Sequence, residues 1–181
     1  MKSLFALVAS AAVATSALAG PAEYSSKSSK GVIPPSPPAP VCPCFAPGAA
    51  FGVFGGGYLP SHGPLENSLG GGALFEYFFT ENIGIQLSYG AYATSPVHHV
   101  YGGDLVFRFP ITELCLAPYI LVGGGGDSDG VNRGYGDAGG GVDIRFDNMN
   151  CMGIFIDGTY HWTGDSDHDF TLVRVGIKFP L

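Results

Sequence analysis

From residue 49 to the end, the sequence alternates repeatedly between apolar and polar positions, and this period of two constrains the fold more than any other feature. The last eleven residues, 171–181, show the pattern best. Their polar face carries the basic residues Arg174 and Lys178. Side chains alternate between the two faces of a strand, so the pattern predicts β-structure with one apolar and one polar face. The apolar face of this segment consists of Val173, Val175, Ile177 and Phe179.

Eight such segments follow one another and predict eight strands. They cover residues 49–58, 69–79, 83–92, 100–109, 116–124, 138–146, 152–162 and 171–181. The short connections are 80–82, 110–114 and 147–150, and they alternate with the longer connections 59–68, 93–99, 125–137 and 163–169. Short turns at one end and long loops at the other are typical of outer-membrane barrels. The sequence therefore predicts an all-β, eight-stranded antiparallel up-and-down transmembrane β-barrel.

Large aromatic side chains lie on the apolar face, near the ends of the predicted strands. The set expected at the short-turn end is Phe79, Phe109, Phe146 and Phe179, and the set at the long-loop end is Tyr101, Tyr160 and Trp162. Two such bands match the aromatic girdles at bilayer interfaces. The apolar face is therefore expected to face lipid. The alternative is a soluble sandwich with a solvated charged face, but its open edges would need protection that the sequence does not show.

The polar face carries four acidic residues, four basic residues and one histidine. They are Glu76, Asp104, Asp143, Asp157, Arg108, Arg145, Arg174, Lys178 and His161. Equal numbers of opposite charges suit an enclosed network of ion pairs, so we expect these side chains to fill the lumen. An eight-stranded barrel has an interior that side chains just fill, which disfavours an open channel.

The final eight residues, RVGIKFPL, resemble the C-terminal assembly signal of bacterial outer-membrane proteins. That signal reads polar, any, Gly, any, any, hydrophobic, any, hydrophobic, and Arg174, Gly176, Phe179 and Leu181 occupy its slots. Members of the family usually end on an aromatic residue, whereas this sequence ends Pro-Leu. With the strand pattern, residues 45–181 resemble the small barrels of the OmpA/OmpX superfamily. The resemblance implies a cell outer membrane location, contact with the lipid bilayer and lipopolysaccharide, a monomeric state and delivery by the barrel-assembly machinery.

The N-terminal residues have a different character. Residues 1–20 have a basic start at Lys2, an apolar stretch too short to span a bilayer, and the cleavage pattern Ala17-Leu18-Ala19, which together predict a signal peptide. Residues 21–47 are rich in Ser and Pro and predict a disordered periplasmic linker that buries no core. The barrel is then expected over residues 48–181.

Composition supports this class of protein. Charged residues make up only 13% of the sequence, whereas soluble domains have roughly 25%. The net charge of −7 disfavours nucleic acid as a partner.

The chain contains four cysteines, Cys42, Cys44, Cys115 and Cys151, and an exported protein meets an oxidising compartment. Four cysteines allow two disulfides in three connectivities. Cys115 and Cys151 begin strands at the same end, but the strand between them puts the pair about 9.6 Å apart, beyond the roughly 7 Å limit for a bond. We therefore expect at least one disulfide from the tail to the barrel rim, unless the turns bend. Cys42 and Cys44 are too close in sequence for a typical zinc pair.

Two motifs in the sequence partly match known catalytic or metal-binding patterns. Lipid A deacylases of this size use a His-x-Ser pair followed by a Glu, whereas here Thr163 follows His161 and no later Glu exists. Asp165, Asp167 and Asp169 alternate as in calcium loops, but they fill no EF-hand pattern. We expect no catalytic residues, no cofactor and no metal site beyond weak calcium candidates. The expected loops are acidic because they also contain Glu66, Asp127, Asp129 and Asp137.

These patterns predict a non-enzymatic outer-membrane barrel with a structural or surface-interaction role, such as envelope integrity or adhesion through acidic external loops. One alternative is a narrow pore or a barrel that binds small solutes. A second alternative is an outer-membrane enzyme that modifies lipid A.

Overall fold

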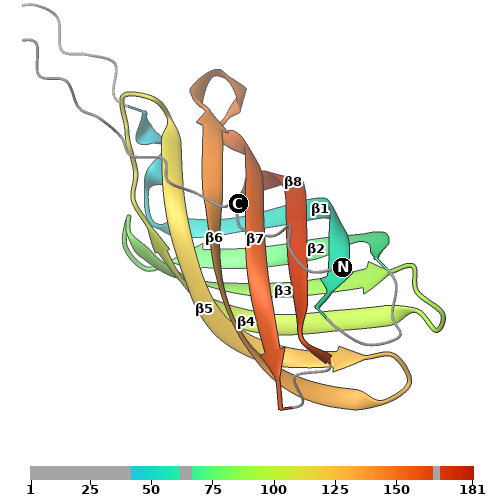
Figure 1. Cartoon of the computed structure of the whole chain (residues 1–181). Coiled ribbons are helices and arrows are strands. Elements are labelled where there is room, and N and C mark those ends of the chain that lie inside the picture. The colour runs from blue at the N-terminus through green and yellow to red at the C-terminus, as the bar shows by residue number, and fades with distance from the viewer. Residues whose placement is uncertain (1–41, 62–66, 165–167) are drawn as a thin grey trace, which may run out of the picture. The chain divides into compact units, whose positions relative to one another are not determined.

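The computed structural model describes residues 42–61, 67–164 and 168–181. These residues form eight strands and two short 3-10 helices (Figure 1). The strands are β1 (Gly48–Pro60), β2 (Ser68–Phe78), β3 (Ile83–Tyr92), β4 (His98–Arg108), β5 (Leu116–Ser128), β6 (Asn132–Phe146), β7 (Met152–Thr163) and β8 (Phe170–Pro180). The helices are η1 (Pro43–Phe45) and η2 (Asp147–Met149). None of the helices in these ranges is long and apolar enough to cross a membrane.

The strands close into a barrel. Each strand pairs antiparallel with its neighbours in sequence, and β1 pairs with β8 to complete the ring. Closure leaves no open sheet edge to protect. The predicted all-β, eight-stranded antiparallel barrel is confirmed.

The two ends of the barrel contain different parts of the chain. The terminal end holds the start of β1, the end of β8 and the turns β2–β3, β4–β5 and β6–β7. The loop end holds the other four connections. From the sequence we expect the terminal end to face the periplasm and the loop end to face the outside.

The connection between β5 and β6 differs from the prediction. Residues 125–137 were expected to form a long loop, but most of them are paired strand, with Asp127 opposite Arg133 and Gly125 opposite Tyr135. The turn comprises only residues 129–131. The glycines and acids of this stretch have the composition of a loop, whereas cross-strand pairing sets their structure. The expected alternation of short and long connections therefore fails here.

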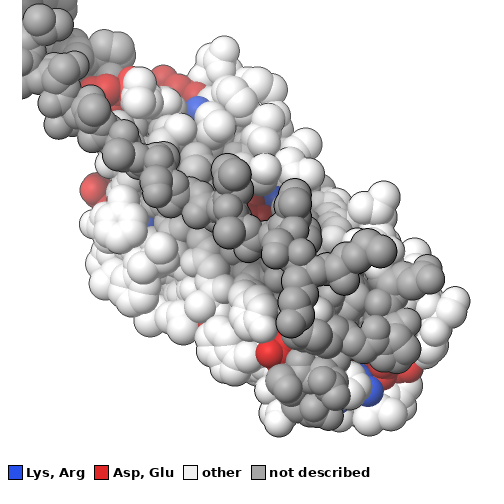
Figure 2. All heavy atoms as spheres, in the orientation of Figure 1, with Lys and Arg blue, Asp and Glu red and all other residues white. Residues whose placement is uncertain are grey.

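The outer wall of the barrel is apolar. Large aliphatic side chains midway along the strands are exposed, including Val175 at 53% and Ile156 at 54%. Where the wall is visible in Figure 2, few charged atoms appear on it, and most of these lie toward the two ends. Phe79 and Phe109 are exposed near the terminal end, and Tyr160 and Trp162 near the loop end, where the girdles were expected. A wall of this kind is the lipid-facing surface of a membrane barrel.

A second set of aromatic side chains points inward, and the sequence pattern did not separate it from the outer set. Tyr135 shows how such a ring fits, because a Cβ at Gly102 or Gly125 would lie only 2.7 or 2.8 Å from its hydroxyl oxygen. Glycines on the inner face thus make room for inner aromatics. The buried rings belong to Phe54, Tyr58, Phe78, Tyr92, Tyr119, Tyr135, Phe155 and Phe170.

Residues 42–47, hereafter the strap, were predicted to be the end of a linker that buries no core. The structure differs: η1 lies at the terminal end, and Phe45 is only 3% exposed. Phe45 packs with Cys42 and Ala117 in a buried cluster. The predicted signal peptide and residues 21–41 of the predicted linker lie outside the described residues.

Candidate functional site in the lumen

The structure places all nine side chains of the predicted charge network inside the barrel, with exposures between 1% and 8%. They occupy three levels. A cluster lies at the terminal end, an ion pair lies in the middle, and a row of polar groups lies toward the loop end.

The terminal-end network is a closed set of two bases and two acids. Arg145 donates to both oxygens of Asp143, at 2.8 and 2.7 Å, and to Glu76 at 3.1 Å. The Lys178 ammonium donates to the same two acids, at 2.7 Å to Glu76 and 3.4 Å to Asp143. Each buried charge therefore has two partners of opposite sign, as burial away from water requires.

The central pair joins neighbouring strands. Arg174 on β8 lies directly opposite Asp157 on β7 and donates to its two oxygens at 2.8 and 2.9 Å. The Tyr119 hydroxyl donates to Asp157 at 2.8 Å. This two-pronged geometry is the strongest that an arginine and a carboxylate can form.

Arg108 behaves differently from the other lumen bases. Within the described part of the chain it forms no ion pair, and it donates to the carbonyls of Glu81 at 3.0 Å and Phe45 at 2.9 Å. Its guanidinium lies 3.7 Å from the ring centre of Phe78 and 5.1 Å from that of Phe45. Cation–π contacts of this kind are attractive. Arg108 therefore attaches the strap to the barrel rather than neutralising an acid.

The polar row toward the loop end follows the strand register. Gln86, Asp104, Gly123, Asp137 and His161 are successive partners across β3 to β7. Gly123 has no side chain, and a Cβ there would collide with Asp104 Oδ1. Asp104 and Asp137 flank this gap, and both line the same small cavity of the lumen. No Lys or Arg of the described ranges forms an ion pair with either acid.

Two acids expected in an external loop lie in the lumen instead. Asp127 and Asp137 are each only 2% exposed, so that expectation is wrong for both. Asp127 lies 3.5 Å from Arg133 and 3.4 Å from the imidazole of His98, which is itself buried. The lumen therefore holds more acids than the four that were predicted, and the expected balance of charges does not hold. The cause is the same extension of β5 and β6 that replaces the predicted loop.

His161 takes part in an arrangement that the sequence analysis missed. Its Nε2 lies 2.8 Å from the Thr159 hydroxyl, and its Nδ1 lies 3.8 Å from Asp137, in the order of a nucleophile–base–acid triad. The cavity that these three residues line has a volume of only about 10 Å³, enough for one water molecule. Thr163, the hydroxyl weighed from the sequence, instead bonds through its backbone N–H to Asp169 at 2.8 Å. The arrangement has no room for an acyl substrate.

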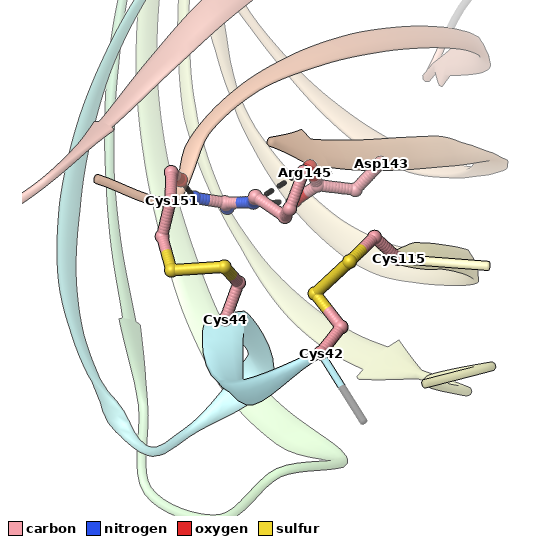
Figure 3. Close-up of a disulfide and its surroundings, with 6 residues drawn as sticks. All are labelled: Cys42, Cys44, Cys115, Asp143, Arg145 and Cys151. Carbon is pink, nitrogen blue, oxygen red and sulfur yellow. Dashed lines mark hydrogen bonds and ion pairs between the residues drawn. A yellow bond between two sulfur atoms is a disulfide. The ribbon is translucent and has the colours of Figure 1, made fainter. Parts of the chain in front are cut away.

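Two disulfides connect the strap to the barrel rim (Figure 3). Cys42 pairs with Cys115 and Cys44 pairs with Cys151, with Cα–Cα distances of 5.3 and 5.2 Å. Of the two connectivities in which both bonds join the tail segment to the rim, the structure has the one that pairs Cys42 with Cys115 and Cys44 with Cys151. Cys115 and Cys151 do not pair with each other.

One group of potential metal ligands in the described residues has both of its sulfur atoms in a disulfide. Donor atoms of Cys44, Asp147 and Cys151 lie within 4.8 Å of one another, but both sulfurs belong to a disulfide. The calcium candidates Asp165 and Asp167 lie outside the described residues. Asp169 accepts hydrogen bonds from the Tyr160 hydroxyl at 2.9 Å and from the Thr163 backbone, and these bonds join it to the end of β7.

Each slot of the proposed assembly signal has a place in the barrel. Arg174 belongs to the central pair, and Phe179 points outward into the wall. Gly176 points inward, where a Cβ would lie 2.6 Å from the Phe155 ring. Leu181 is 80% exposed at the terminal end. The pattern thus alternates between lumen and lipid faces like the rest of β8.

Comparison with known proteins adds the fold class. No family model and no curated protein matches the sequence. Among solved structures, Neisserial surface protein A (NspA) superposes with a TM-score of 0.58 at 10% identity, covering 74% of this chain and 97% of that chain. The N-terminal β-barrel domain of Pseudomonas aeruginosa OprF gives 0.51 at 17% identity, covering 72% and 97%. A de novo designed transmembrane β-barrel gives 0.50 at 18% identity, covering 75% and 97%.

At these identities the likeness concerns the fold, which is that of the small eight-stranded outer-membrane barrels. The apolar wall between two aromatic bands is a separate physical observation, and it requires a lipid surrounding. The chain therefore has the fold of the small eight-stranded transmembrane β-barrels, and its apolar wall is that of a barrel surrounded by lipid.

Proposed function

We propose that this protein is a closed, non-enzymatic barrel that supports the integrity of the outer membrane and presents a rigid hairpin at the surface. The observation that carries the proposal is the filled interior. Paired charges, aromatic rings and the polar row occupy successive levels of the lumen, and the strap covers the terminal end.

The filled interior disfavours both the pore and the lipid-modifying enzyme. A pore needs a continuous aqueous path, whereas the lumen is crossed by bonded pairs such as Arg174–Asp157 and Lys178–Glu76. An enzyme acting on lipid needs its catalytic groups at the lipid face. The triad-like residues Thr159, His161 and Asp137 are buried in the lumen instead.

The β5–β6 hairpin supports the surface-interaction part of the proposal. β6 is the longest strand among the described residues, with 15 residues, and the tip at 129–131 exposes 60% of Val131. Asp129 makes the tip rigid by accepting hydrogen bonds from the Val131 backbone at 3.3 Å and from Arg133 at 3.0 Å. A pre-ordered tip loses little conformational entropy when a partner binds. This hairpin takes the place of the acidic loops that the sequence suggested as an adhesive surface.

The proposal includes the cellular setting. The barrel-assembly machinery would insert the chain through the β8 signal, with the terminal end toward the periplasm. The folded protein would work as a monomer surrounded by lipids and lipopolysaccharide. Tags placed at 129–131 should then be reachable on intact cells, whereas tags at 80–82 should not.

The test combines envelope integrity with conductance. A deletion strain should become more permeable to a hydrophobic dye, and wild-type protein should reverse this defect. A variant with the tip residues 129–131 replaced by Gly-Asn-Gly should restore integrity but lose any surface binding. Purified protein should give no ion current in a planar bilayer. Steady channel openings from the wild-type protein would replace this proposal with the pore alternative.

A further inference from the structure

The two disulfides that hold the strap lie in different surroundings. Cys42 is 6% exposed and packs with Phe45 and Ala117 in a buried apolar cluster, against which the half-buried Cys115 and Cys44 both pack. Cys44 and Cys151 are half-buried and line a cavity of about 180 Å³. That cavity lies between the strap and the last residues of the chain, and neither Cys42 nor Cys115 lines it. A reagent entering it meets the Cys44–Cys151 bond.

The backbone at Cys151 is held in an unusual conformation. Asn150 and Cys151 have φ values of 52° and 58°, in the left-handed region that residues with a side chain rarely adopt. Such conformations persist only where the surrounding structure enforces them. Cys115 has a φ of 49°, so the backbone of both rim cysteines is held in this region.

Cys151 is also joined directly to the charge network of the lumen. Its carbonyl accepts a hydrogen bond at 3.3 Å from the Arg145 guanidinium, which also donates to Asp143 (Figure 3). The same guanidinium donates to Glu76. Cys115 contacts Arg145 only through the backbone, where its carbonyl accepts the Arg145 N–H at 2.8 Å. A movement at Cys151 therefore reaches the side chain of Arg145.

We propose that the Cys44–Cys151 bond is a redox modification site whose substrate is a dithiol reductant, and that its state sets the position of the Arg145 guanidinium. A thiolate of the reductant attacks one sulfur of the bond, forms a mixed disulfide and releases the other cysteine as a thiolate. The second thiol of the reductant then attacks the mixed disulfide and releases the remaining protein cysteine. The protein gains two thiols, and the reductant leaves as a disulfide. The Cys42–Cys115 bond keeps the strap attached throughout.

The first test measures the order of reduction in the oxidised full-length protein in detergent micelles. Dithiothreitol is added, samples are quenched with an alkylating reagent over time, and peptide mass spectrometry follows each cysteine. Cys44 and Cys151 should become alkylated at least tenfold faster than Cys42 and Cys115. Equal rates, or earlier opening of Cys42–Cys115, would overturn the assignment of the site.

The second test measures the coupling to the lumen. The Arg145 Nε–H signal in ¹H–¹⁵N NMR spectra, assigned with Arg145→Lys, should shift when the first bond opens and return on re-oxidation. A Cys44→Ser/Cys151→Ser variant should show the shift without reductant, and the matched Cys42→Ser/Cys115→Ser variant should show a smaller one. An Arg145 signal that stays in place, or that moves equally in both variants, would remove the coupling from the proposal.

Discussion

The terminal and loop halves of the lumen bury charge in different ways. In the terminal half, Arg145 and Lys178 share Glu76 and Asp143, so every charge of that network has two partners of opposite sign. In the loop half, Asp104 and Asp137 of the polar row form no ion pair with a Lys or Arg of the described ranges, and His161 lies 3.8 Å from Asp137. Aromatic rings and imidazoles surround this half, as where His161 stacks on Phe170 at 4.4 Å. The comparison shows that an inward position implies burial but does not ensure an ion pair.

The largest expected effect follows from removing Arg145, which bonds to both acids of the terminal-end network. Arg145→Ala would leave Asp143 and Glu76 with one shared base, and breaking a buried pair typically costs about 3–5 kcal/mol of unfolding free energy. Arg133→Ala is the comparison variant, because the Arg133 side chain is 22% exposed and Asp127 keeps His98 as a second contact, so the loss should be smaller than for Arg145→Ala. Urea unfolding in detergent micelles measures both. Equal losses would mean that the terminal network is solvated.

The next effect tests the gap at Gly123, which lies between Asp104 and Asp137 in the strand register. Gly123→Ala places a Cβ against the Gly103 carbonyl and Asp104 Oδ1, and overpacking of this kind costs about 1–3 kcal/mol. Gly134→Ala is the control, since its nearest neighbour, the Gly125 carbonyl, would be 3.8 Å away. We expect the control to stay within about 0.5 kcal/mol of the wild type. If both variants unfold at the same urea concentration, the polar row is not tightly packed.

A third prediction is that removing one acid changes the unfolding free energy differently in the two halves of the lumen. Asp143→Asn removes a partner of both Arg145 and Lys178 and should lower the unfolding free energy. Asp137→Asn removes one of the two carboxyl groups that flank Gly123 and should leave the unfolding free energy unchanged or raise it by roughly 0.2–1 kcal/mol, the size of cross-strand charge effects. The same unfolding assay compares them. A clear loss for Asp137→Asn would show that a bound cation or proton makes the loop half as dependent on its acids as the terminal half.

The smallest expected effect lies at the hairpin tip, outside the membrane-spanning part. Partial burial raises the pKa of Asp129, but hydrogen bonds from Arg133 and from the Val131 backbone outweigh this and hold the pKa below its usual value. The ionised carboxylate therefore stabilises the tip above its unfolded pKa of about 3.9, and this contribution is lost as the pH falls through the lower folded pKa. The protection of the Val131 amide against hydrogen exchange, measured relative to the intrinsic exchange rate at the same pH, should fall on acidification in wild-type protein. Asp129→Asn should show this low protection at every pH tested.

Much of the fold could be predicted because the alternation of apolar and polar residues along a strand shows which side chains share a face. Val175 and Ile156 face lipid, and Arg174 and Asp157 face the lumen, as the alternation indicated. The loop end was predicted less well. Composition suggested a loop at 125–137, but pairing between β5 and β6 carries Asp127 and Asp137 into the lumen. Local composition describes what a segment prefers alone, whereas pairing with a neighbouring strand overrides that preference.

The sequence by itself determined the number of strands, their antiparallel order and the face on which most side chains lie, since period-two alternation and turns are local properties. Only the tertiary structure decided which lumen groups meet. Glu76 and Lys178 are 102 residues apart in sequence, and the two disulfides span 73 and 107 residues. These contacts depend on register and on the closing of β1 against β8, because a shift of one residue would turn every side chain of a strand to the other face.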